Sequence, residues 1–205
     1  MNSKRIENKY ILDERSKHKI INKILNSGYF ELYKERNIES VYYDNIKLQS
    51  FNDSNEGSVP RKKIRIRSYD GFKNDFNYEI KEVNANGRFK SVKKVSSLPE
   101  KCIDDIYRVM YPLVIIRYKR KYFTNNFIRL TLDWEINYQE FKSKKIYKSR
   151  HLVLESKLSD GTKYNEELNN IKIFGLNNIS FSKYKEAINL SMPFNQIKFW
   201  KTYVQ

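Results

Sequence analysis

The chain has 205 residues, with 40 lysine and arginine residues against 24 aspartate and glutamate residues, which gives a formal net charge of +16. Apolar residues make up 40% of the sequence, which is enough to bury a core and excludes general disorder. Six glycines and four prolines exclude collagen-like and low-complexity chains. No glycine-rich phosphate loop occurs, so charged side chains must do most of the binding of any phosphate.

The numbers of cysteines and histidines and the lengths of the apolar runs exclude further classes of protein. Cys102 is the only cysteine, so no internal disulfide can form, and His18 and His151 are too few for a multi-histidine metal site. No apolar run approaches the roughly 20 residues of a membrane-spanning helix. The first residues lead into charged sequence without an apolar signal core. We therefore expect a soluble, cytoplasmic protein with one domain over residues 1–205.

Several segments alternate with the two-residue period of a β-strand, and one face of each carries charged residues. In the segment 61–69, basic residues occupy every odd position from Arg61 to Arg67, while Ile64 and Ile66 occupy the opposite face. The other segments of this kind are 5–10, 78–81, 128–136 and 152–158.

Four amphipathic helices are predicted around these strands. The first runs over 13–26, with Asp13 as its N-cap and Gly28 after its end. A second is predicted from Pro99 to Met110, because apolar residues recur there at helical spacing. The remaining helices are predicted over 163–174 and 182–190, and loops are expected near 52–60, 84–87 and 139–150.

The charged strand faces decide between two sheet architectures. An antiparallel sheet with one solvated face is the ordinary cause of such alternation. Here, however, arginine and acidic residues recur at matched places on strand after strand. This pattern favours an α+β fold with a central antiparallel β-barrel, whose interior is charged and whose outer apolar face is covered by amphipathic helices.

Seven short pieces of these strands and helices carry a family resemblance when they are taken in order along nearly the whole chain. They are Arg5-Ile-Glu7-Asn-Lys9-Tyr10, Ser40-Val-Tyr42-Tyr-Asp44, Arg65-Ile-Arg67 with Glu79-Ile-Lys81, Tyr118-Lys-Arg120, Arg129-Leu-Thr131-Leu-Asp133, Leu154-Glu155-Ser-Lys157 and Ser182-Lys183-Tyr184. The series resembles the polyphosphate polymerase domain of the vacuolar transporter chaperone (VTC) family, a branch of the triphosphate tunnel metalloenzymes. The first piece has one glutamate between cations, and not the paired glutamates of the wider superfamily, which favours the VTC branch.

The resemblance implies a tunnel with basic residues at one side and carboxylates for a divalent metal at the other. Side chains implied to act in catalysis are Arg65, Arg67, Lys81, Arg120, Arg129 and Glu155. Implied phosphate ligands are Lys9, Arg65, Arg67, Lys81, Lys90, Arg120, Arg129, Lys157 and Lys183, with Arg88 as a neighbour of Lys90. Glu155 is the implied ligand of Mn²⁺ or Mg²⁺, with Asp133, Glu135 and Glu7 as candidate helpers.

These residue types suit phosphoryl transfer. Arginine forks bind phosphate oxygens in pairs and keep their proton, and the transfer needs mainly alignment and charge neutralisation with a bridging metal ion. The resemblance therefore implies an enzyme that moves the terminal phosphoryl group of a nucleoside triphosphate, with ATP as the first choice, onto a polyphosphate chain. Two alternatives stay open: a triphosphatase of the same fold, and a non-catalytic module that binds polyphosphate or nucleotide.

The expected partners follow from the same resemblance. They are a nucleoside triphosphate and a polyphosphate chain, and a membrane protein that exports the product is compatible with this assignment. Nucleic acid is not an expected partner, because such a protein would present its cations on an outer face together with stacking aromatic residues.

Overall fold

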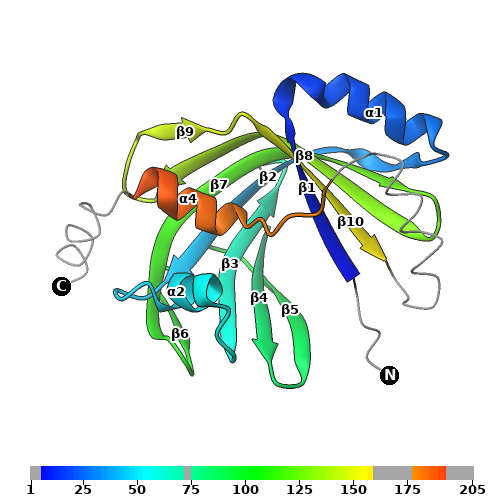
Figure 1. Cartoon of the computed structure of the whole chain (residues 1–205). Helices are drawn as coiled ribbons and strands as arrows, with labels where there is room; N and C mark the ends of the chain where they lie inside the picture. Colours follow the sequence, from blue (N-terminus) through cyan, green and yellow to red (C-terminus); the bar gives the residue numbers. More distant parts are fainter. Residues whose placement is uncertain (1–5, 72–74, 159–176, 193–205) are drawn as a thin grey trace. The chain divides into compact units, whose positions relative to one another are not determined.

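The computed structural model describes residues 6–71, 75–158 and 177–192 (Figure 1). It consists of a mostly antiparallel sheet with few helices, which confirms the predicted α+β class. The strands are β1 (Ile6–Asp13), β2 (Phe30–Asp44), β3 (Arg61–Tyr69), β4 (Phe76–Asn84), β5 (Gly87–Val95), β6 (Cys102–Asp104), β7 (Arg108–Thr124), β8 (Ile128–Glu140), β9 (Ile146–Lys148) and β10 (His151–Leu158). The helices are the 3-10 turn η1 (Glu14–Ser16), α1 (Lys17–Asn26), α2 (Gln49–Glu56) and α4 (Lys183–Ser191).

Hydrogen bonds order the strands as β1-β10-β8-β7-β2-β3-β4-β5, with β6 on β7 and β9 on β8. Among the described residues this order ends at β1 and β5, which do not pair with each other, so closure into a barrel stays a prediction. No helix in the described part of the chain is long and apolar enough to cross a membrane.

Contacts within the chain define two compact units, which are described one after the other. Unit 1 comprises residues 1–36, 118–136 and 149–181, and unit 2 comprises residues 37–117, 137–148 and 182–205. The strands β2, β7 and β8 each contribute residues to both units. The single domain expected from chain length stays a prediction.

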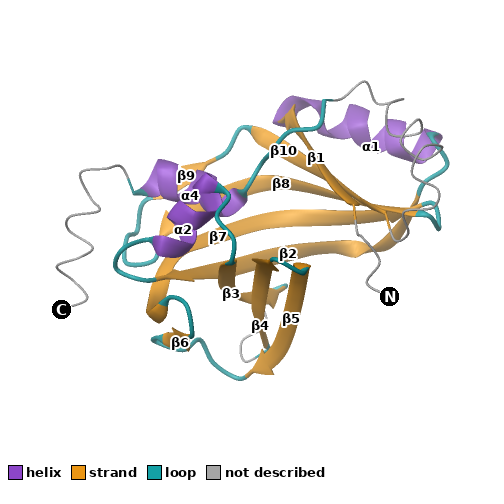
Figure 2. Ribbon diagram, turned by 60° about the horizontal axis from the view of Figure 1, so that its bottom comes forward, coloured by secondary structure: helices purple, strands orange, loops and turns teal. Residues whose placement is uncertain are grey.

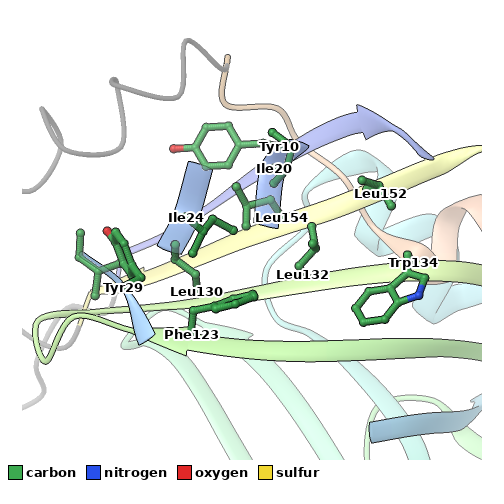
Figure 3. Close-up of a cluster of buried hydrophobic side chains, with 11 residues drawn as sticks. Tyr10, Ile20, Ile24, Tyr29, Phe123, Leu130, Leu132, Trp134, Leu152 and Leu154 are labelled. Carbon is green, nitrogen blue, oxygen red and sulfur yellow. The ribbon is translucent and has the colours of Figure 1, made fainter. Parts of the chain in front are cut away.

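The apolar face of unit 1 is covered by α1, as predicted. The helix begins later than the predicted residue 13, because the side chain of Asp13 caps the 3-10 turn η1 and α1 follows that turn. The helix ends before Gly28, which takes a left-handed φ of +83°. Ile20 and Ile24 of α1 pack against Leu132 and its neighbours on the sheet (Figure 3). Burial of each isoleucine contributes about 1.5–3 kcal/mol to stability. The buried sheet residues and flanking aromatics of this cluster are Tyr10, Tyr29, Phe123, Ile128, Leu130, Leu132, Trp134, Leu152 and Leu154.

In unit 2, the helix predicted over residues 99–110 is wrong. These residues form β6, a turn and the start of β7, with Cys102 opposite Met110 in the hairpin. Asp104 fixes the turn, because its Oδ1 accepts backbone hydrogen bonds from Ile106 at 2.9 Å and Tyr107 at 3.1 Å. Cys102, Ile106 and Met110 reach the core from a tight hairpin, whereas Ile103 is exposed. The buried residues of this core cluster are Val41, Tyr43, Ile64, Ile66, Tyr107, Met110 and Ile115.

Two helices lie side by side in unit 2 (Figure 2). The first, α2, occupies a segment that was expected to be a loop, and it forms because the carboxylate of Asp44 accepts backbone hydrogen bonds from Ser50 and Phe51 in its first turn. The second, α4, was predicted, and Ser182 is its N-cap. The helix predicted over 163–174 lies outside the described residues.

Candidate active site

One face of unit 1, opposite the face that packs on α1, carries charged residues from β1, β10 and β8. Side chains two residues apart share a strand face, so the alternation with Leu130 and Leu132 turns Arg129 to this face. The strand register places Glu7 opposite Lys157 and Lys157 opposite Arg129. We call the following residues the carboxylate cluster: Glu7, Lys9, Arg120, Arg129, Asp133, Glu155 and Lys157.

Glu155 is the buried acid at the centre of the carboxylate cluster, with 6% of its surface exposed. Its Oε1 lies 3.0 Å from Nζ of Lys157, and its Oε2 lies 3.9 Å from Nη2 of Arg120. Burial alone would raise the pKa of this carboxyl group. A hydrogen bond with Glu7 and the nearby charges of Lys157 and Arg120 outweigh burial and lower this pKa well below its ordinary value. Glu155 is therefore ionised at neutral pH and is a weak base.

Asp133 is engaged with Arg120 through both of its oxygens. Nε of Arg120 lies 2.5 Å from Oδ1 of Asp133, and Nη2 lies 2.7 Å from Oδ2. Such two-point pairs are among the strongest hydrogen-bonded contacts in proteins. Burial would lower the pKa of Arg120, but the charge of Asp133 raises it well above its ordinary value. Asp133 therefore holds Arg120 in place, and its role as a helper in metal binding stays a prediction.

Glu135 is a predicted metal helper that the structure does not bring to Glu155. Its φ of +50° is left-handed and interrupts the alternation of side chains along β8. Its carboxylate lies 2.9 Å from Nζ of Lys119, which is adjacent to Arg120 on β7. Because neighbouring residues of a strand point to opposite faces, Lys119 and Glu135 lie on the face opposite the carboxylate cluster.

Arg129 is exposed and is held by aromatic rings. Its Cζ lies 5.3 Å from the ring centroid of Tyr122 and 6.0 Å from that of Tyr33, and these two rings meet edge to face. Aromatic faces attract a guanidinium group without neutralising its charge. This arrangement leaves the donors of Arg129 suited to an anion.

Glu155 and Glu7 fit a divalent cation better than the other acids of unit 1. Glu7 lies beside Glu155, and Nζ of Lys157 lies 3.8 Å from Oε2 of Glu7 and 3.0 Å from Oε1 of Glu155. The hydroxyl of Thr131, opposite Glu155 in the register, is buried and lacks a hydrogen-bond partner among the described residues. Mg²⁺ and Mn²⁺ take oxygen ligands, often one or two carboxylates with phosphates and water. The described residues contain no group of three or more histidine, cysteine or acidic side chains placed to hold a metal.

The charged face of unit 2 centres on Arg65 of β3. Nε and Nη2 of Arg65 lie 2.9 and 2.5 Å from Oε2 of Glu79, its register partner on β4. Arg67, two residues along the same face, donates from Nε to Oγ of Ser40 at 3.1 Å. Burial would raise the pKa of Glu79, but Arg65 and Arg67 lower it to about 2. Both arginines are buried, with 9% and 6% of their surfaces exposed.

Further cations surround this pair, and together they form what we call the basic cluster: Arg65, Arg67, Glu79, Lys81 and Lys90. Lys90 of β5 is opposite Lys81 in the register and lies 3.1 Å from Oε1 of Glu79. Arg88 is exposed and shares the strand face of Lys90. Lys183 begins α4 next to Ser182, whose hydroxyl accepts a hydrogen bond from Lys63 of β3 at 3.3 Å.

Three residues of unit 2 to which the sequence analysis gave no role, Tyr42, Asp44 and Tyr184, are part of this polar network. The hydroxyl of Tyr42 accepts a hydrogen bond from Nη1 of Arg65 at 2.8 Å. The ring of Tyr184 stacks on that of Tyr42, and its hydroxyl donates to Asp44 at 2.6 Å. The signal for this network was the polar face that Ser40, Tyr42 and Asp44 share at two-residue spacing on β2.

Solved structures share this fold at low sequence identity. A candidate adenylate cyclase from Vibrio parahaemolyticus is 14% identical, with a TM-score of 0.59 over 92% of this chain and 99% of that chain. The PH1819 protein from Pyrococcus horikoshii is 12% identical, with a TM-score of 0.52 over 90% of this chain and 98% of that chain. The PH1012 protein from the same organism is 13% identical, with a TM-score of 0.51 over 82% of this chain and 87% of that chain.

Sequence comparison defines the family. The model of the VTC domain matches residues 4–108 and 100–192, so the chain belongs to the VTC domain family. This result confirms the resemblance read from the seven sequence pieces. The comparison with curated protein sequences gives no match.

Proposed function

We propose that the protein is a metal-dependent polyphosphate polymerase that transfers the terminal phosphoryl group of a nucleoside triphosphate, in the first place ATP, to a polyphosphate chain. The observation that carries this proposal is the composition of the basic cluster. The five described side chains of this cluster are four cations, Arg65, Arg67, Lys81 and Lys90, and one carboxylate, Glu79, so their formal charges sum to +3. A triphosphate carries roughly one negative charge per phosphoryl unit, and its burial requires such an excess of cations.

The phosphate-binding role extends to further side chains. We assign it to the basic cluster and, in addition, to Lys9, Arg120, Arg129, Lys157 and Lys183. Arg65 and Arg120 are each fixed by a carboxylate, so they supply a preorganised field with little cost of reorganisation during transfer. Arg129 rests on two rings and offers its donors to an anion directly.

Glu155, with Glu7 beside it, is the site proposed for Mn²⁺ or Mg²⁺. Bound there, the ion would neutralise charge on the phosphate oxygens and help to align them. The chain's own contribution is to hold both carboxylates near Lys157 and to fix Arg120 on Asp133. The ionised state of Glu155 at neutral pH suits a ligand for a cation.

The chemistry of Glu155 also favours transfer to a phosphate chain over hydrolysis. An attacking water molecule benefits from a base with a pKa near the working pH. The lowered pKa of Glu155 makes it a poor base for that step. The end of a polyphosphate chain is already ionised and needs no such base. The lowered pKa of Glu155 therefore supports a phosphate chain, and not water, as the acceptor of the phosphoryl group.

One assay tests the proposal. Purified protein is incubated with ATP, Mn²⁺ and a short polyphosphate primer, and both long-chain product and free phosphate are followed over time. We expect chain growth in step with loss of ATP. Release of phosphate without chain growth would support a triphosphatase in place of the polymerase. Tight binding of polyphosphate without any turnover would support a binding module.

A matched pair of variants connects this assay to the site. Glu155→Gln keeps the shape of the side chain and removes its charge, and it should abolish chain growth. Glu31→Gln removes an acid of unit 1 whose contact is a surface pair with Lys121, so it should grow chains like the wild type. Equal activity of the two variants would contradict the proposed metal site.

A further inference from the structure

Tyr42 has a buried hydroxyl group within the basic cluster that the proposed chemistry has not used. Only 8% of the residue is exposed, and its oxygen accepts the hydrogen bond from Nη1 of Arg65 at 2.8 Å. Among the described residues, none accepts a hydrogen bond from this hydroxyl. A buried hydroxyl that accepts without donating carries a cost that a bound acceptor would remove.

The ring that carries this hydroxyl is held in place by Tyr184. The ring of Tyr184 stacks on Tyr42 with centroids 4.9 Å apart and an angle of 12° between the rings. The Tyr184 hydroxyl in turn donates to Oδ2 of Asp44, which also accepts the backbone N–H of Phe51 in α2. Because Tyr184 and α2 both hold this carboxylate, the phenol of Tyr42 is preorganised and does not have to be ordered when a ligand binds.

The electrostatic surroundings of Tyr42 are cationic. Burial would raise the pKa of the phenol, but Arg65, Arg67 and Lys81 lower it to about 7. The charged and titratable groups around Tyr42 are Arg65 and Arg67 of β3, Glu79 and Lys81 of β4, Tyr184 of α4 and Asp44 on its own strand. Arg117 of β7 pairs with Glu39, which lies on the opposite face of β2 from Tyr42. A phosphate anion placed among these cations would favour the protonated phenol, which can donate to it.

We propose that Tyr42 is a further ligand of the phosphate site and donates its phenolic proton to a phosphate oxygen bound beside Arg65. The inference rests on the proposed function, because it takes a triphosphate or polyphosphate as the ligand. No covalent bond forms or breaks. The proton stays on Tyr42, and where the free protein has an ionised phenol, binding is accompanied by uptake of one proton from solvent.

Calorimetric titration with inorganic tripolyphosphate, without metal, tests this role. Tyr42→Phe keeps the ring that stacks on Tyr184 and removes the donor, and at about pH 6 we expect its Kd to rise about 10-fold. Tyr43→Phe is the matched control, because Tyr43 lies on the opposite face of β2 and donates to the carbonyl oxygen of Pro99 at 2.7 Å. We expect the Kd of this control to stay within about twofold of the wild type.

The pH dependence separates a phosphate ligand from a residue that only supports the fold. At about pH 9 the free phenol is ionised, and the advantage of the wild type over Tyr42→Phe should shrink towards unity. Tripolyphosphate should also raise the pKa seen in the tyrosinate absorbance of the wild type, a measurement that needs no variant. Equal Kd values at both pH values, or a tyrosinate titration that tripolyphosphate does not shift, would overturn the role of Tyr42 and leave the proposed function standing. A wild type that binds no tripolyphosphate would overturn the proposed function itself.

Discussion

The two charged clusters contain the same number of cations and differ in their acids. In unit 2 the described cluster consists of the cations Arg65, Arg67, Lys81 and Lys90 and one carboxylate, Glu79, with a formal sum of +3. In unit 1 the cations Lys9, Arg120, Arg129 and Lys157 meet three carboxylates, Glu7, Asp133 and Glu155, for a sum of +1. The first composition suits a polyanion, and the second can accept a metal cation among its oxygens. We therefore expect the cluster of unit 2 to bind phosphate, and the cluster of unit 1 to bind a metal ion as well as phosphate.

Both clusters also contain a buried ion pair, and the largest expected effect tests the one in unit 1. Asp133→Ala leaves the guanidinium of Arg120 buried without its two-point partner. We expect a loss of about 3–5 kcal/mol in the free energy of unfolding, measured by urea denaturation. Asp75→Ala, which removes a partner of the exposed Lys94, should cost less than about 1 kcal/mol. A loss for Asp133→Ala as small as that of the control would contradict the pairing.

The corresponding pair in unit 2 should give an acid-sensitive contribution to stability. The pKa of Glu79 falls from its ordinary 4.5 to about 2 in the folded protein, so folding favours the ionised form. This contribution is fully present above about pH 5 and is lost as the pH falls towards 2. Over that range the wild type should lose about 3 kcal/mol more unfolding free energy than Glu79→Gln. Parallel pH profiles of the two proteins would refute this assignment.

Metal dependence is expected in unit 1 alone. Glu155→Gln should lower the rate of chain growth at least about 100-fold, because the cation loses its anionic ligand. Arg67→Ala should leave the affinity for Mn²⁺ without substrate within about twofold of the wild type, because this residue belongs to the basic cluster. Calorimetric titration of each variant with Mn²⁺ measures the difference. If Glu155→Gln binds Mn²⁺ as tightly as the wild type, the assignment of Glu155 as the metal ligand is wrong.

The smallest of the expected effects is a loss of tripolyphosphate affinity when a cation of the basic cluster in unit 2 is removed. Arg67→Ala should raise the Kd for tripolyphosphate about 10-fold, since one charged donor is lost. Arg61→Ala is a control on the same strand, because its side chain donates to the carbonyl oxygens of Gly57 and Ser58. Its Kd should stay within about twofold of the wild type. Equal losses in both variants would mean that bulk charge, and not the basic cluster, governs binding.

Strand faces could be predicted from the sequence because their period of two is independent of distant contacts. The alternation over 61–69 placed Arg65 and Arg67 opposite Ile64 and Ile66, and the structure has the same arrangement. Features that depend on an irregular backbone conformation or on contacts between distant parts of the chain could not be predicted from this alternation. The turn at Asp104 depends on side-chain hydrogen bonds within a hairpin, and the left-handed backbone of Glu135 moves its carboxylate to the other face.

The candidate site likewise has features that could be predicted from the sequence and features that could not. The family resemblance implied the arginines and Glu155, but the sequence did not indicate which acids neutralise which cations. The pairing of Arg120 with Asp133, a predicted metal helper, depends on how the strands align. No signal in the sequence selected Tyr42, because a tyrosine on a strand is more often a core residue than a ligand. Its role depends on the hydrogen bond from Arg65, which only the folded chain displays.

Titration of tripolyphosphate into wild type, Arg67→Ala and Glu155→Gln, each with and without Mn²⁺, tests the division between the two clusters most directly. We expect Arg67→Ala to lose affinity under both conditions. Glu155→Gln should bind metal-free tripolyphosphate like the wild type and lose only the gain in affinity that Mn²⁺ brings. The account is contradicted if Arg67→Ala binds tripolyphosphate as tightly as the wild type, or if Mn²⁺ strengthens binding equally in Glu155→Gln.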